Sequence, residues 1–194
     1  MTETSHSLLG RLAQDADPAS WERLVEVYTP LLRSWLKRYD ALSAADVDDL
    51  VQDVLLAVSK DLREFRHNRE PGAFRGWLRV ILVNRVRKFW RSRDRRPLAV
   101  GGSDFLEQIA QLEDQSSRVS GEWNREHDRH VLRTLLGTVQ PRFSEQTWEA
   151  FRRQLFDGRK AADVADELGL SLDSVYAAKS RILLALRNAA DGMV

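Results

Sequence analysis

Apolar side chains recur at intervals of three and four residues along most of the chain, which is the spacing of an α-helix. The clearest run includes Trp21, Leu24, Tyr28, Leu31 and Trp35. Glycine and proline are sparse, and β-branched residues do not gather into the alternating runs that would indicate strands. The sequence therefore predicts an all-α protein made of two small helical domains joined by a flexible linker.

The first predicted domain covers residues 1–96 and begins with a helix that starts at Asp17 and Pro18. Asp is a good helix cap, and Pro suits the first helical position. Pro30 lies inside the apolar pattern of this helix. Because proline removes a main-chain hydrogen bond, we expect a break or a kink near Pro30.

The second predicted helix is acidic at its start and apolar over a wide face. Ser43 or Asp46 can cap it, and it is expected to run to about Phe65. Its apolar side chains cover more of the helix than one small domain needs to bury. They are Val47, Leu50, Val51, Val54, Leu55, Val58 and Leu62, with Leu56 and Ala57 to one side. We therefore expect a second contact surface here.

Residues 65–96 are strongly basic, with eleven Lys or Arg side chains against two acidic ones in a chain of net charge +1. A long helix is expected from about Ala73 to Arg93, and five aromatic rings lie in this segment, at Phe65, Phe74, Trp77, Phe89 and Trp90. Cations neutralise phosphates and rings stack on exposed bases, so the combination is typical of proteins that bind single-stranded or opened nucleic acid. The alternative is a solvated basic helix whose rings face a core. Helical spacing indicates that some rings do pack inward.

The composition changes between residues 97 and 120, where glycine, serine and acidic residues replace the basic ones. We interpret this segment as a flexible linker with a short helix at about 105–112. Residues 97–128 carry two basic and seven acidic side chains. Such asymmetry indicates two kinds of partner, one anionic and one that meets the acidic helices.

The second predicted domain, residues 121–194, ends in the most specific pattern of the chain. A short amphipathic helix begins near Arg159, Gly169 supplies a left-handed turn, and Ser171 caps a helix that runs to about Ala189. An ordinary helical hairpin, which shares this apolar spacing, is the alternative. In a helix-turn-helix, the outer face of the second helix meets the major groove. The predicted DNA-contacting residues are Ser174, Tyr176, Ala177, Lys179, Ser180 and Arg181.

Two parts of the chain resemble conserved regions of the sigma-70 family of transcription initiation factors. Residues 48–54 (DDLVQDV), followed by residues 74–78 (FRGWL) and by Asn84 and Arg85, are similar to the second region. Residues 163–171 (DVADELGLS) are similar to the start of the fourth region. Both domains stand in the order of the family, and the closest similarity is to its two-domain extracytoplasmic-function (ECF) class.

The resemblance implies an RNA polymerase sigma factor, which binds core polymerase, directs promoter-specific initiation and is not an enzyme. The acidic-apolar helix would dock on the clamp helices of the β′ subunit, through Asp49, Leu50, Gln52, Asp53 and Leu56. The basic segment would recognise and open the −10 element with a base flipped from the stack. Its residues for this role are Arg66, Asn68, Arg75, Asn84, Arg85, Lys88, Arg91 and Arg95.

The resemblance also implies that the C-terminal helix reads the −35 element as duplex DNA. The polymerase β flap would be a further partner, and the acidic linker would follow the RNA path and imitate a transcript. Many family members carry a basic run early in the recognition helix, whereas residues 176–179 here are YAAK. We therefore expect a different −35 sequence or weaker reliance on it. An anti-sigma protein could cover the same faces, and no residue of the chain identifies one.

Two other functions were weighed against this one. A two-domain helix-turn-helix regulator that binds duplex DNA without polymerase leaves the basic, aromatic-rich segment unexplained. An enzyme would need a metal or a phosphate site, and we expect neither a metal nor another cofactor. His127 and His130 lie three residues apart near two acidic residues, but exposed helix histidines are the simpler interpretation. No glycine-rich phosphate motif is present.

The sequence contains no cysteine, which excludes a disulfide scaffold and a thiolate zinc site and fits a reducing cytoplasm. Residues 1–10 lack the pattern of a signal peptide, and no apolar stretch approaches membrane-spanning length. We therefore expect a cytoplasmic protein that does not insert into a membrane.

Overall fold

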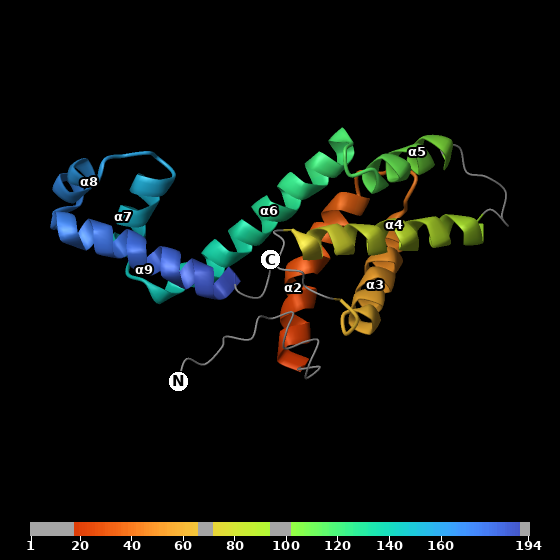
Figure 1. Cartoon of the computed structure of the whole chain (residues 1–194), viewed down its shortest axis with the longest axis horizontal. Coiled ribbons are helices and arrows are strands. Elements are labelled where there is room, and N and C mark those ends of the chain that lie inside the picture. Colours follow the sequence, from red (N-terminus) through yellow and green to blue (C-terminus); the bar gives the residue numbers. More distant parts are fainter. Residues whose placement is uncertain (1–17, 66–71, 94–101, 191–194) are drawn as a thin grey trace. The chain divides into compact units, whose positions relative to one another are not determined.

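The computed structural model describes residues 18–65, 72–93 and 102–190, and every regular element within these ranges is a helix (Figure 1). The predicted all-α fold is therefore confirmed. The chain divides into two compact units between Val131 and Leu132. We call the part before this division unit 1 and the part after it unit 2. The division lies later in the chain than residue 121, where the sequence places the start of the second domain.

Helix α2, Pro18–Leu36, runs through Pro30 and continues for another turn and more, so the break predicted there does not occur. A proline removes one main-chain hydrogen bond from a helix. The residues beside it are held by the core, because Tyr28, Leu31 and Leu32 are at most 4% exposed. Tertiary packing therefore stabilises the helix across the proline.

Helix α3, Ala44–Asp61, begins with a reciprocal cap. The Ser43 Oγ accepts a hydrogen bond from the Asp46 main-chain N–H at 3.2 Å, and the Asp46 carboxylate accepts one from the Ser43 N–H at 3.0 Å. The predicted cap is confirmed, although the helix ends four residues before Phe65. Helix α4, Ala73–Arg93, has the bounds predicted from the sequence.

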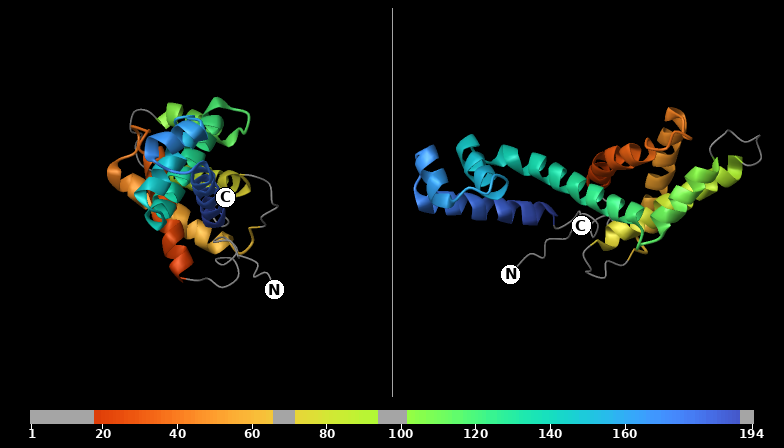
Figure 2. Two further views of the ribbon diagram at one scale, coloured as in Figure 1. Left: turned by 90° about the vertical axis from the view of Figure 1, so that its left-hand side faces the viewer. Right: turned by 90° about the horizontal axis from the view of Figure 1, so that it is seen from above.

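Helix α5, Gly102–Glu113, lies beside α4 (Figure 2), and helix α6, Arg118–Val139, follows it. Leu112 and Trp123 are fully buried in unit 1. The Trp123 ring meets the Trp35 ring of α2 edge to face, with 5.2 Å between the ring centroids. Apart from residues 114–117, the described part of the segment interpreted as a linker is therefore helical, and it contributes buried side chains to the core of unit 1.

Two histidines hold α6 against α2. The His127 ring is 1% exposed, and its Nε2 lies 3.4 Å from the Tyr28 hydroxyl. His130 Nε2 donates a hydrogen bond to the Val27 carbonyl oxygen at 2.6 Å. Burial lowers the pKa of His127 to about 4, so this ring is neutral at pH 7. The interpretation of His127 as an exposed residue is wrong, because this side of α6 faces the core.

Unit 2 contains the end of α6, a short 3₁₀ helix at Gln140–Arg142, and three α-helices. These are α7, Glu145–Leu155; α8, Ala161–Leu168; and α9, Leu172–Ala190. Two buried clusters form its core. One comprises Ala150, Val164, Ala165, Val175 and Ala178, and the other comprises Val139, Phe151 and Ile182. Ser144 caps α7, since its Oγ accepts a hydrogen bond from the Thr147 N–H at 3.3 Å.

The neutral state of His127 makes the stability of unit 1 depend on pH. Its pKa is about 4 in the folded chain against an ordinary value of 6.5, so unfolding takes up a proton between these two values. We expect full stability above pH 6.5 and a loss on the order of 3 kcal/mol as the pH falls towards 4. Urea unfolding followed by tryptophan fluorescence measures this profile. The His127→Gln variant should show a weaker dependence of stability on pH. An equally steep dependence would show that His127 is not the group responsible.

Candidate nucleic-acid interface

Helix α4 buries one face and exposes another. Phe74, Leu78 and Leu82 are at most 1% exposed and pack into the core of unit 1. Asn84, Lys88 and Arg91 are exposed and follow one another at intervals of four and three residues. This spacing places their side chains on one side of the helix. We call these three residues the open row of α4.

Three arginines of α4 are bound by groups of α5 and α6. Arg75 pairs with Asp128. Arg87 donates two hydrogen bonds to the two carboxylate oxygens of Glu113, at 2.9 and 2.5 Å. Arg79 is 4% exposed, and its Nη1 donates to the hydroxyl of Ser120 at 2.9 Å. These three cations are therefore already engaged inside unit 1.

The other described cations of α4 are not held in this way. Among the described residues, no ion pair and no side-chain hydrogen bond involves Arg85, Lys88 or Arg91. Lys88 and Arg91 belong to the open row, whereas Arg85 follows Asn84 by one residue and so points about 100° away from it. Two adjacent cations of the open row are thus available to phosphates.

Three aromatic rings meet at the start of α4. The Trp77 ring lies 4.8 Å from the Phe65 ring and 5.5 Å from the Phe74 ring, measured between centroids. Phe74 is buried, as the helical spacing predicts, while Phe65 and Trp77 are half-buried. Trp77 precedes Asn84 by seven residues, so the two share a side of the helix. Partly open rings and unpaired cations therefore lie on one side of α4.

The residues predicted to contact the −10 element are only partly brought together. Asn84, Lys88 and Arg91 share the open row, while Arg75 is engaged by Asp128. The remaining predicted positions, Arg66, Asn68 and Arg95, lie outside the described residues.

The residues predicted to dock on polymerase lie on α3, and four of the five share an exposed side. Asp49, Gln52, Asp53 and Leu56 are exposed, and Leu56 reaches 55%. Their spacing of three, four and seven residues from Asp49 places them on one face of the helix. Leu50 is 1% exposed and belongs to the core. The wide apolar pattern of α3 is thus divided between a core face and a surface that contains Leu56.

The outer side of α9 carries the residues predicted to meet the major groove. Ser174, Tyr176, Ala177, Ser180 and Arg181 are exposed, and Lys179 is half-buried. The inner side of α9 is buried through Val175, Ala178 and Ile182, which are at most 2% exposed. Gly169 adopts φ +63°, a left-handed conformation that glycine tolerates best. The Ser171 Oγ accepts a hydrogen bond from the Ser174 N–H at 3.1 Å and so caps α9.

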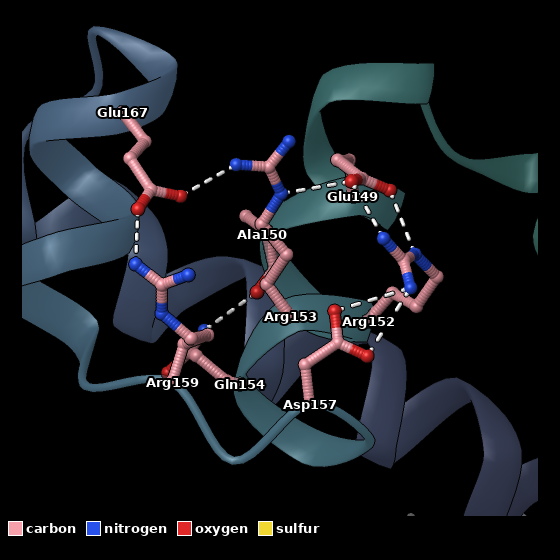
Figure 3. A network of polar contacts seen from close by, with 8 residues as sticks. All are labelled: Glu149, Ala150, Arg152, Arg153, Gln154, Asp157, Arg159 and Glu167. Atoms are coloured by element: carbon pink, nitrogen blue, oxygen red, sulfur yellow. Dashed lines mark hydrogen bonds and ion pairs between the residues drawn. The ribbon is translucent and has the colours of Figure 1, made fainter.

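A network of ion pairs joins α7 to α8 (Figure 3). Glu149 accepts hydrogen bonds from Arg152 and Arg153 at 2.9 and 2.8 Å. Arg153 also donates to one carboxylate oxygen of Glu167 at 2.7 Å, and Arg159 pairs with the other. The hydrogen bonds from Arg152 and Arg153 lower the pKa of Glu149 to about 2. The network therefore stays ionised at neutral pH and links α8 to the rest of unit 2.

The two histidines considered as metal ligands have protein partners. His127 Nδ1 lies 3.3 Å from the Asp128 carboxylate, in addition to the contact of Nε2 with Tyr28. No group of three or more His, Asp or Glu side chains that could hold a metal ion occurs in the described ranges.

Sequence reasoning missed the partners of the α4 arginines, namely Glu113, Ser120 and Asp128. The signal that pointed towards them was the opposite charge of neighbouring segments, since the acidic residues 97–128 directly follow the basic residues 65–96. Charge blocks do not reveal which side chains pair, because pairing depends on how α5 and α6 pack on α4.

Comparison with known proteins identifies one region of the chain. Residues 24–96 match the family model of sigma-70 region 2. This match covers most of α2 and all of α3 and α4, and with them the exposed side of α3 and the open row of α4. No curated protein matches the chain in sequence. None of the helices that the structure describes is both long and apolar enough to cross a membrane.

Leu50 lies in the core and Leu56 lies on the surface of the same helix. Truncating these two leucines should therefore lower the free energy of unfolding by unequal amounts. Leu50→Ala should lower the free energy of unfolding by about 2–5 kcal/mol, because it leaves a cavity in a core. Leu56→Ala should change it by no more than about 0.5 kcal/mol. Chemical denaturation of both variants measures the difference. Equal losses would show that the two side chains are buried alike.

Proposed function

Because residues 24–96 make this chain a member of the sigma-70 family, we propose that it is an ECF-type sigma factor that directs promoter-specific initiation by RNA polymerase. The observation that carries the proposal is the open row of α4 beside the half-buried Trp77. Cations next to a partly open ring are what a separated DNA strand needs, since phosphates take the charges and bases stack on rings.

The proposed role of α4 is to bind the opened −10 element. Asn84, Lys88 and Arg91 would contact one strand, with Arg85 beside them and Arg75 available after release from Asp128. The cost of moving a base out of the stack is a few kcal/mol, and stacking on a side chain at about 1–3 kcal/mol per base offsets part of it. Arg66, Asn68 and Arg95 complete the proposed set.

The proposed role of α3 is to bind the clamp helices of the β′ subunit of core polymerase. Asp49, Gln52, Asp53 and Leu56 form the docking side, which combines two carboxylates, an amide and an exposed apolar side chain. Leu50 supports this side from the core.

Unit 2 is the proposed reader of the −35 element. The outer side of α9 offers Ser174, Tyr176, Lys179 and Arg181 to the major groove, and the small Ala177 permits close approach of the backbone. The polymerase β flap is proposed as a further partner of this unit. An anti-sigma protein would have to cover one of these surfaces.

Reversing one charge on α3 tests the docking proposal. Asp53→Arg should weaken binding to immobilised core polymerase at least tenfold, because it places a cation where an acidic group is expected to meet the clamp. Asp61→Arg makes the same charge change on another side of α3 and should leave binding unchanged. The unaltered chain should bind core polymerase and support run-off transcription. A chain that ignores polymerase but binds duplex DNA tightly would be a regulator instead.

Removing two charges from α9 tests the role of unit 2. Lys179→Ala with Arg181→Ala should lower promoter affinity of the holoenzyme and reduce the slope of log K against log salt by up to about 2. The pair Arg142→Ala with Arg187→Ala removes the same charge from other parts of unit 2 and is the control. Filter binding over a range of salt concentrations gives both slopes. An unaltered slope in the first pair would place the DNA contact elsewhere.

A further inference from the structure

Acidic side chains of α5 and α6 are paired with arginines of the helix proposed to bind DNA. Glu113 ends α5 and binds Arg87 through both carboxylate oxygens. Asp128 of α6 binds Arg75 near the start of α4. These contacts lie within unit 1 and bring part of the acidic segment onto the basic one. A carboxylate that holds a guanidinium by two hydrogen bonds has the geometry that a phosphate would adopt there.

The position of Arg87 brings Glu113 to the edge of the open row. Arg87 precedes Arg91 by four residues, so the two are neighbours on the helix surface. The Arg87 side chain is 34% exposed and Glu113 is 52% exposed, so solvent and ions reach the pair. The hydrogen bond from Arg87 lowers the pKa of Glu113, which is therefore ionised at neutral pH. A strand that follows Lys88 and Arg91 would meet this carboxylate.

Arg75 stands two residues before Trp77, near the start of α4, and its side chain points to nearly the opposite side of the helix from that ring. Its side chain is 21% exposed, and that of its partner Asp128 is 56% exposed. The third engaged arginine differs, because both Arg79 and Ser120 are buried, and the Ser120 hydroxyl also donates to the Leu112 carbonyl oxygen at 2.8 Å. Two of the three contacts are thus open to competition, and the third anchors α4 to α5 and α6.

We propose that Glu113 and Asp128 act as built-in substitutes for promoter phosphates, occupying Arg87 and Arg75 in the free chain until an opened DNA strand displaces them. The inference rests on the proposed function, since it assigns a form of regulation to the same surface of α4. Exposed ion pairs contribute little to stability, so displacement leaves the fold intact. The free chain therefore binds single strands more weakly than its basic segment would suggest.

Neutralising the two carboxylates tests the proposal. The probe is a fluorescent single-stranded DNA oligonucleotide, and the full-length chain is titrated into it over a range of salt concentrations. Glu113→Gln and Asp128→Asn should each raise affinity about two- to fivefold, and each should steepen the slope of log K against log salt by about 0.7. Because partial unfolding would also separate these arginines from their carboxylates, thermal unfolding of each variant verifies that the fold is kept.

The control is Glu126→Gln. Glu126 lies on α6 like Asp128, but it pairs with Arg38, which follows the end of α2, so this variant removes the same charge and an ion pair without freeing an arginine of α4. A double-mutant cycle tests whether the gain in affinity depends on Arg87. The gain from Glu113→Gln should disappear in an Arg87→Gln background. Equal gains in the control, or a gain that persists without Arg87, would overturn the proposal.

The outcome separates this inference from the proposed function. If the unaltered chain binds core polymerase and single-stranded DNA while Glu113→Gln behaves like Glu126→Gln, the competition is refuted and the sigma-factor role stands. If the chain and all variants bind neither polymerase nor single-stranded DNA, the proposed function is refuted, and the competition is refuted with it.

Discussion

The packing of α4 against the rest of unit 1 determines which of its many basic side chains can act on another molecule. One side of α4 is buried through Phe74, Leu78 and Leu82, and a buried arginine anchors it to Ser120. The opposite side retains the open row and the half-buried Trp77. If α5 and α6 did not pack on α4, Arg75, Arg79 and Arg87 would all be exposed, and the charge of the helix would be spread over most of its surface.

Because of this packing, the basic side chains of α4 differ in how accessible they are to another molecule. Arg79 is fixed in the core, where a guanidinium needs its hydrogen bonds because burial of an unpaired charge is costly. Arg75 and Arg87 are held by carboxylates that remain accessible. Lys88 and Arg91 have no such partner among the described residues. A strand that approaches α4 therefore meets unpaired cations first and paired ones only by displacing acidic side chains.

Unit 2 uses a small core to hold the short helix α8 and the proposed recognition helix α9 in a fixed relation. Ala150, Val164 and Val175 bring α7, α8 and α9 together. The Gln154 amide adds a hydrogen bond from α7 to the Val175 carbonyl oxygen of α9 at 3.2 Å. The Glu149 and Glu167 network links α7 and α8 on the surface (Figure 3). The residues on the outer side of α9 are thus not part of the two buried clusters that form the core of unit 2.

Local features of the sequence predicted the local features of the fold. The caps at Ser43 and Ser171, the turn at Gly169 and the bounds of α4 depend on residues close together in the chain, and all agree with the structure. What could not be predicted depends on contacts between distant residues. Pro30 stays within a helix because the core holds its neighbours, and His127 is buried because α6 packs on α2.

The same distinction applies to the candidate site. The family resemblance pointed to α3 and α4, but the docking residues that it implied include Leu50, which lies in the core. The −10 contacts that it implied include Arg75, which Asp128 engages. Deciding such cases requires knowledge of which element covers each face, and that information lies in how the helices of unit 1 pack on one another.

The most direct test of the central claim is a crosslink from the open row to promoter DNA. A photoreactive amino acid at position 88 would be incorporated into the full chain, assembled with core polymerase and bound to a promoter fragment selected by that holoenzyme. We expect a crosslink to one strand of the −10 element that forms only when the complex opens, and none from the same probe at the exposed position 63 of unit 1. Crosslinks confined to polymerase, or equal before and after opening, would contradict it.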